Sequence, residues 1–146
     1  MVHSEIDGPE LDALKQQAVA SGFASRVNFA GRLKGEELTR TIARHRIMAI
    51  PSTVEEGFPV TALEGIACGC VLVGTRGGGL PEAVGPCGLL VPRGDGKALS
   101  DALALLLTTP EVFGKLRVAA RAHLDHHTDA RFVERYRMAI EALHMR

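Results

Sequence analysis

Apolar residues along this chain alternate between short unbroken runs and stripes with a helical period. Most of the runs are rich in Val, Ile and Leu, which is the character of strands buried on both faces. They predict four strands, at residues 26–31, 46–50, 71–73 and 88–91. Apolar positions spaced by three and four predict helices at residues 9–22, 36–44, 60–68, 81–84 and 96–107, then one from Pro110 and one from Thr128 toward Leu143.

Local signals support several of these helix ends. Pro9 stands at the first position of the first helix, where a backbone N–H would have no partner, and Gly22 ends that helix. Asp95, Thr109 and Thr128 each precede a predicted helix, where a side-chain oxygen can cap the first turn.

The helix at residues 60–68 has two predicted sides. Its core stripe is expected to consist of Val60, Leu63, Ile66 and Ala67. Thr61 and Glu64 are three positions apart and therefore share the other side.

The alternation of strands and helices predicts an α/β fold, a doubly wound and mostly parallel Rossmann-like sheet in a single domain over residues 1–146. A doubly wound half normally begins on a strand, whereas the first predicted element here is a helix. We therefore expect a sheet that is incomplete at its N-terminal end. An edge left open in this way would allow self-association as a homo-oligomer.

Composition narrows the class of protein. The 146 residues are 46% hydrophobic, which suits a globular domain with a core. Lys plus Arg and Asp plus Glu number 17 each, so net charge gives no sign of nucleic-acid binding. No apolar stretch approaches the ~20 residues that span a bilayer, and the first residues lack a signal-peptide core. A cytoplasmic location is therefore expected.

Cysteine and histidine positions show no strong metal motif. Cys68, Cys70 and Cys87 are odd in number and lack zinc or redox spacing, which favours reduced thiols over a metal or redox centre. His126 and His127 could suggest a metal site, but adjacent side chains on a helix point apart. The chain also lacks a dinucleotide-binding glycine motif, a P-loop lysine and a nucleophile–base pattern.

The most informative segment lies between two glutamates eight positions apart, Glu56 and Glu64. A glycine-containing loop here leads into the helix at residues 60–68, whose N-terminus offers backbone N–H groups and a partial positive charge to phosphate. Carboxylates can accept hydrogen bonds from sugar hydroxyls. Taken singly, these features have ordinary alternatives, namely a solvated loop acid, a helix cap and a surface glutamate. Residues 77–79, three glycines, would permit close backbone approach to a ligand or form a flexible turn.

Taken in order, the landmarks resemble the C-terminal, donor-binding domain of the GT-B retaining glycosyltransferases called group 1 or family 4. The strongest match is Pro51-Ser52 followed by Glu56-Gly57-Phe58 and Leu63-Glu64, which is similar to the two-glutamate signature of that family. The other matching pieces are Gly8-Pro9-Glu10, Val27-x-Phe29-x-Gly31, Ala67-x-Gly69, Thr75, Gly78-Gly79-x-Pro81-Glu82 and Gly88-Leu89-Leu90-Val91.

The resemblance implies a nucleotide-diphospho-sugar donor, linked to UDP, GDP or ADP, and no metal. Glu56 would be the catalytic residue that contacts the transferred sugar, while the backbone of Gly57 and Phe58 approaches the sugar hydroxyls. The helix start at Val60 and Thr61 would hold the diphosphate. The leaving diphosphate would help to deprotonate the acceptor, which gives retention of configuration.

Three further residues are implied in binding the nucleotide. Glu64 would accept hydrogen bonds from the ribose hydroxyls. Arg32 and Leu33 would contact the base through their backbone.

Several departures from the family pattern limit the expected activity. The family's Gly-Arg-Leu…Lys-Gly segment supplies two cations to the diphosphate at the start of the domain, and we expect that segment and the acceptor-binding N-terminal domain to be missing here. Gly31-Arg32-Leu33-Lys34-Gly35 has similar letters but lies at a later landmark of the family pattern. Pro59 stands where many members have glycine, and Asp129 replaces an aromatic residue. We expect little transfer by this chain alone, with an acceptor domain or partner chain supplying the rest. The alternative is a non-catalytic module that binds nucleotide sugar or a partner. The full-length enzyme could work at the cytoplasmic face of a membrane.

Overall fold

The computed structural model describes residues 2–4 and 10–144. Its internal contacts divide the chain into two compact units, Met1–Thr41 and Ile42–Arg146. Each unit is described here by itself. No helix in the described residues has the length and apolar character needed to cross a bilayer.

The first unit contains a small parallel sheet that the sequence did not predict in full. Strand β1 (Val2–Ser4) pairs in parallel with β2 (Val27–Phe29), so the described chain has a strand before its first helix. The expectation that the chain opens on a helix was therefore wrong. A three-residue strand is too short for a period to show, and its pairing depends on a partner far along the chain.

The helices of the first unit lie close to their predicted positions. Helix α1 (Leu11–Ala20) is followed by Gly22 in the left-handed region, with φ of 72°. Pro9, the predicted first residue of this helix, lies outside the described residues. A short 3-10 helix, η1 (Ala24–Arg26), precedes β2, and α2 (Gly35–Ala43) begins in this unit and ends in the second.

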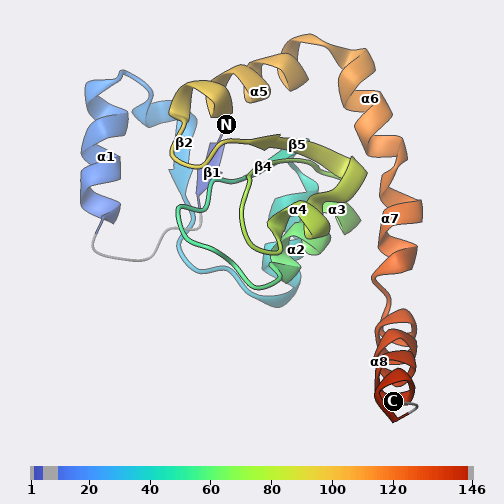
Figure 1. The fold of residues 1–146 in the computed structure, drawn as a ribbon. Coiled ribbons are helices and arrows are strands. Elements are labelled where there is room, and N and C mark those ends of the chain that lie inside the picture. The colour runs from blue at the N-terminus through green and yellow to red at the C-terminus, as the bar shows by residue number, and fades with distance from the viewer. Residues whose placement is uncertain (1, 5–9, 145–146) are drawn as a thin grey trace. The chain divides into compact units, whose positions relative to one another are not determined.

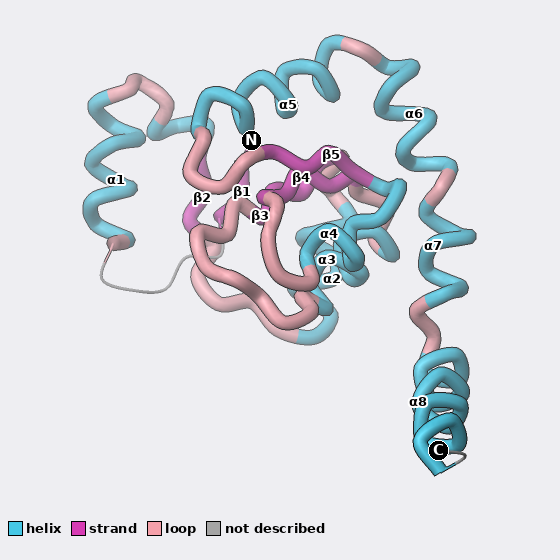
Figure 2. Tube along the Cα trace, in the orientation of Figure 1, coloured by secondary structure: helices cyan, strands magenta, loops and turns pink. Residues whose placement is uncertain are grey.

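The second unit is built on a parallel sheet of three strands in the order β3-β4-β5 (Figures 1 and 2). The strands are β3 (Ile47–Ile50), β4 (Val71–Thr75) and β5 (Gly88–Val91), and every residue of the central strand β4 is buried. Ile47 pairs with Val71, and Leu72 pairs with Gly88. These strands confirm the prediction of a parallel α/β fold.

Helices cover both faces of this sheet, as Figure 1 shows. Alternate residues of β4 point to opposite faces, so Leu72 packs with Ile66 and Leu80 in one core while Val71 and Val73 pack in the other. The helices and the short 3-10 helix of this unit are α3 (Val60–Ala67), α4 (Leu80–Val84), η2 (Gly85–Cys87), α5 (Gly96–Thr108), α6 (Pro110–Val118), α7 (Ala120–His126) and α8 (Asp129–His144).

The predicted caps are confirmed at two of three positions. The Asp95 carboxylate accepts a hydrogen bond from the N–H of Ala98 at 2.9 Å. The Thr128 hydroxyl oxygen accepts one from the N–H of Arg131 at 3.4 Å. Thr109 precedes α6 as predicted, but its side chain makes no cap hydrogen bond. Helix α7 was not predicted, because its seven residues include only one large apolar side chain, Leu124.

The predicted core stripe of α3 was wrong at two residues. Val60 is 59% exposed and Ala67 is also exposed, whereas Ala62, Gly65 and Ile66 are buried. The buried side follows small residues because the helix lies close to the sheet. A Cβ added at Gly65 would lie 2.5 Å from Met48 Sδ and 3.2 Å from Leu72 Cδ2.

Candidate functional site

The loop between β3 and α3, residues 51–59, holds the first predicted glutamate in a fixed position. The Ser52 hydroxyl donates a hydrogen bond to Oε1 of Glu56, and the Glu56 side chain is half-buried. Ser52 is itself anchored on β4, because the Thr75 hydroxyl donates to the Ser52 carbonyl at 2.7 Å. Two successive hydrogen bonds therefore orient the carboxylate from the carboxyl end of the central strand.

The glycine run at residues 77–79 supports the same loop. The N–H of Gly79 donates to the Glu56 carbonyl at 2.8 Å. A Cβ at Gly78 would overlap the Glu56 carbonyl oxygen, and one at Gly79 would overlap that of Gly57. The close backbone approach predicted for these glycines is therefore made to the β3–α3 loop in this structure.

Helix α3 begins at this loop without a side-chain cap. Its N-cap is Pro59, which offers no hydrogen-bonding side chain, so Val60 and Thr61 lie in a first turn whose N–H groups point out of the helix end. Thr61 and Glu64 are both exposed, which confirms that they share the outer side of α3. An uncapped helix end beside a carboxylate and a hydroxyl suits a ligand with both phosphate and hydroxyl groups.

The other predicted binding residues, Arg32 and Leu33, belong to the first unit, in the segment between β2 and α2. The Arg32 side chain is exposed and that of Leu33 is half-buried. Their predicted contact with a nucleotide base stays a prediction.

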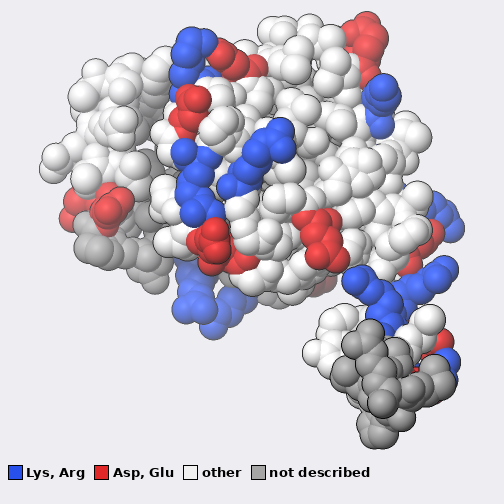
Figure 3. Space-filling view, viewed as in Figure 1, with Lys and Arg blue, Asp and Glu red and all other residues white. Residues whose placement is uncertain are grey.

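An arginine that the sequence did not single out lies beside the loop. Arg93, just after β5, places Nη2 3.7 Å from Oε1 of Glu55, and its guanidinium lies against Gly77. A signal for it was present, since it follows the carboxyl end of a parallel strand, where ligands bind in this fold class. Figure 3 shows acidic and basic side chains interspersed on the visible face.

Two histidine rings also pack near the loop. The rings of Phe58 and His127 have centroids 5.5 Å apart, and those of His123 and His127 are 4.7 Å apart. The adjacent His126 instead has Nδ1 2.8 Å from the carbonyl of Ala122. The two neighbouring histidines thus have different partners, as predicted.

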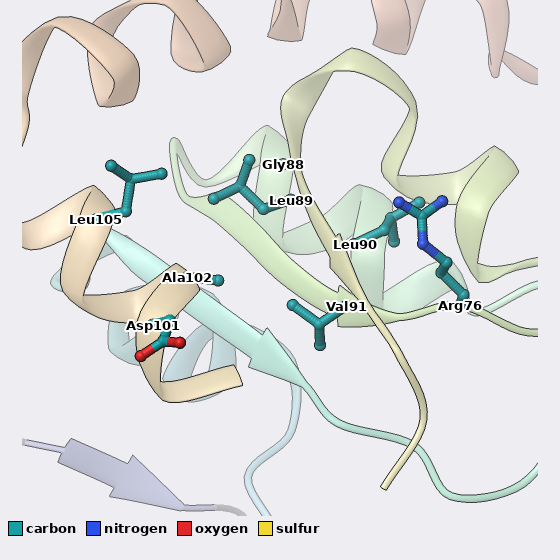
Figure 4. Close-up of a pocket in the computed structure, with 8 residues that line it drawn as sticks. All are labelled: Arg76, Gly88, Leu89, Leu90, Val91, Asp101, Ala102 and Leu105. Carbon is teal, nitrogen blue, oxygen red and sulfur yellow. The ribbon is translucent and has the colours of Figure 1, made fainter. Parts of the chain in front are cut away.

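In the part of the chain that the structure describes, no group of three His, Cys, Asp or Glu side chains is placed to hold a metal ion. A hollow of about 520 Å³ lies over β5 and α5. Figure 4 shows its lining, which shares no residue with the predicted site: Arg76, Gly88, Leu89, Leu90, Val91, Asp101, Ala102 and Leu105. The hollow and the predicted site at Glu56–Glu64 are therefore separate places in the second unit.

The second unit is thus a parallel α/β sheet whose carboxylate-bearing loop leads into a helix N-terminus without a side-chain cap. The family model for glycosyl transferases of group 1 matches residues 5–109, and the chain belongs to this family.

Individual relatives agree with this assignment. The chain is 34% identical over 140 residues to 2-deoxystreptamine N-acetyl-D-glucosaminyltransferase of Streptomyces fradiae, covering 92% of this chain and 33% of that protein. It is 37% identical over 139 residues to D-inositol 3-phosphate glycosyltransferase of Corynebacterium jeikeium, covering 94% and 31%. HepE of Anabaena, solved in complex with UDP and glucose, matches at 25% identity with a TM-score of 0.74, covering 94% of this chain and 38% of HepE. The chain thus spans about a third of the length of the curated relatives it matches.

Proposed function

We propose that this chain is the donor-binding part of a retaining glycosyltransferase, which takes a sugar from a nucleotide diphosphate to an acceptor hydroxyl. The observation that carries the proposal is the oriented Glu56 carboxylate at the uncapped start of α3. The family membership supports glycosyl transfer, and HepE, a structural relative, was solved with UDP and glucose.

In the proposed reaction, Glu56 orients the donor sugar and stabilises the positive charge that develops on it. The bond between the anomeric carbon and the diphosphate oxygen breaks, and a bond to the acceptor oxygen forms on the same face. The acceptor proton passes to the leaving diphosphate. The backbone of Gly57 and Phe58 lies along the sugar hydroxyls.

The charge of the diphosphate is offset by the N-terminus of α3 at Val60 and Thr61. Arg93, 3.7 Å from Glu55, is a further cation beside the loop. Glu64 accepts hydrogen bonds from the ribose. No metal takes part in this scheme.

Because the chain spans about a third of its relatives' length, we expect it to bind the donor but to transfer little sugar alone. An acceptor-binding domain or partner chain would complete the enzyme. A purified chain that transfers sugar efficiently, and loses this activity in Glu56→Ala, would contradict the expected inactivity.

Calorimetry tests the donor site directly. The chain is titrated with UDP-glucose, GDP-mannose and ADP-glucose, and we expect it to bind at least one of them. Hydrogen bonds to a charged group contribute about 1.5–3 kcal/mol, so Glu64→Ala should lower the affinity for the donor by at least about tenfold. Glu64 is exposed, so the free energy of unfolding should hardly change.

Glu111→Ala is the matched control, because it removes another exposed glutamate, in the first turn of α6. It should leave donor affinity unchanged. Failure of all three donors to bind, or equal affinity in the Glu64→Ala variant, would overturn the proposed site. Binding without transfer, even when an acceptor domain is supplied, would favour a non-catalytic module.

A further inference from the structure

The β3–α3 loop contacts the C-terminal end of α7 through one aromatic pair. Phe58, whose side chain is 39% exposed, packs its ring against that of His127 at a centroid distance of 5.5 Å and an interplanar angle of 37°. His127 is the C-cap residue that directly follows α7, just before α8. One side of the loop therefore rests on a ring supplied by the C-terminal helices.

His127 is in turn fixed by His123, one turn earlier in α7. The two rings meet edge to face at 4.7 Å. Nε2 of His123 lies 2.9 Å from the Ala83 carbonyl of α4, which is hydrogen-bonding distance. Its ring fills the space above Gly85, which has φ of 49° and no room for a Cβ. The histidine pair therefore links the loop to α4.

The charged groups around His127 come from three helices. Glu82 of α4 and Arg135 of α8 form an ion pair at 3.8 Å, and His123 and His126 lie on α7 itself. Burial is the main cause that lowers the pKa of His127, followed by His123, while Glu82 opposes the shift and Arg135 and His126 add to it. Neutral imidazole is thus the form that this packing favours.

The sign of the pH effect follows from this direction. A base whose pKa is lower in the folded chain binds fewer protons there than it does when unfolded. The stabilisation from this packing is therefore fully present above the ordinary histidine pKa of about 6.5. It is lost as the pH falls below 6.5 and through the lowered pKa of His127.

We propose that His127 is a positioning residue for the β3–α3 loop. Its neutral ring holds this loop in the donor-binding conformation through Phe58, and protonation of His127 loosens the loop. The proposal rests on the proposed function, because it names what keeps that site in shape. It also gives α7 a role in donor binding that the sequence pattern did not indicate.

Three variants separate the ring from its titration. His127→Phe keeps an aromatic ring against Phe58 but cannot be protonated, while His127→Ala removes the ring. His126→Ala is the matched control, because it removes the adjacent histidine, whose Nδ1 lies 2.8 Å from the Ala122 carbonyl. Thermal unfolding of each variant shows whether it is folded at both pH values.

The first measurement is calorimetry with UDP-glucose at pH 7.5 and pH 5.5. Each phosphate of this donor has one ester and one anhydride linkage, so the donor has no terminal phosphate. Its charge therefore stays constant between these pH values, whereas a terminal phosphate titrates near pH 6. Loss of the Phe58–His127 aromatic pair should weaken UDP-glucose binding about two- to tenfold. We expect that loss in His127→Ala at pH 7.5, and in the wild type and His126→Ala on going to pH 5.5.

His127→Phe should bind as the wild type does at pH 7.5 and keep that affinity at pH 5.5. A pH effect of wild-type size in His127→Phe, or wild-type affinity in His127→Ala at both pH values, would overturn the proposal.

The second measurement needs no donor, so it separates this inference from the proposed function. The histidine ring protons of the wild type and of Phe58→Ala are titrated by NMR. If the rings are coupled as proposed, Phe58→Ala should move the pKa of His127 upward, toward its ordinary value. An unchanged His127 pKa would refute the coupling. Failure of UDP-glucose to bind to the wild type would refute the donor site instead.

Discussion

Thr75 anchors the loop that carries Glu56 to the central strand β4. Its side chain is 5% exposed at the end of β4, and its hydroxyl donates to the Ser52 carbonyl at 2.7 Å. Thr75→Val keeps the shape of the side chain but leaves that carbonyl without its donor. The Ser52 carbonyl is partly buried, and an acceptor left unsatisfied in such a place costs about 1–3 kcal/mol, so we expect the free energy of unfolding to fall by that amount.

Urea unfolding followed by circular dichroism measures this loss, with an unchanged dependence on urea as the sign that only stability has changed. Thr108→Val is the matched control, since its hydroxyl also donates to a backbone carbonyl, that of Ala104 at 2.8 Å, but is exposed. Water can replace that bond, and the change should stay within about 0.5 kcal/mol. Equal small losses in the two variants would refute the role given to Thr75.

Two further predictions concern the glycine run and the buried thiols. Gly79→Ala should lower the free energy of unfolding by about 1–3 kcal/mol, because its Cβ would overlap the Gly57 carbonyl. Gly114→Ala, in open space within α6, should raise the free energy of unfolding by up to about 1 kcal/mol. Equal effects of the two substitutions in urea unfolding would contradict this. Burial raises the pKa of Cys70 to about 11, so iodoacetamide at pH 8 should alkylate Cys68 well before Cys70. Comparable rates by mass spectrometry would show that Cys70 is not protected.

Strongly apolar segments could be predicted from the sequence because their signal is local. The apolar runs at β4 and β5 form strands at their predicted places, since the residues of each run carry the signal themselves. Strand β1 has no such run, and it exists through pairing with β2. The buried side of α3 was misjudged because close packing selects Ala62 and Gly65, which carry little hydrophobic signal.

The candidate site divides in the same way. The segment from Glu56 to Glu64 is contiguous, so a loop, a helix start and two carboxylates could be predicted together. What holds the loop could not, because Thr75, Gly79 and His127 reach it from β4, the glycine run and α7. Such contacts depend on the packed fold. Thr75 and Gly79 are landmarks of the family pattern, but nothing in the sequence indicates that they hold this loop.

The central claim is that the helix start between Glu56 and Glu64 binds a nucleotide-sugar donor. Side-by-side titration of the wild-type chain and the Glu64→Ala variant with the donor that binds tests it most directly. The account predicts saturable binding to the wild type and at least about tenfold weaker binding to the variant, with both proteins equally folded. Absence of binding to the wild type, or the same affinity in both, would contradict it.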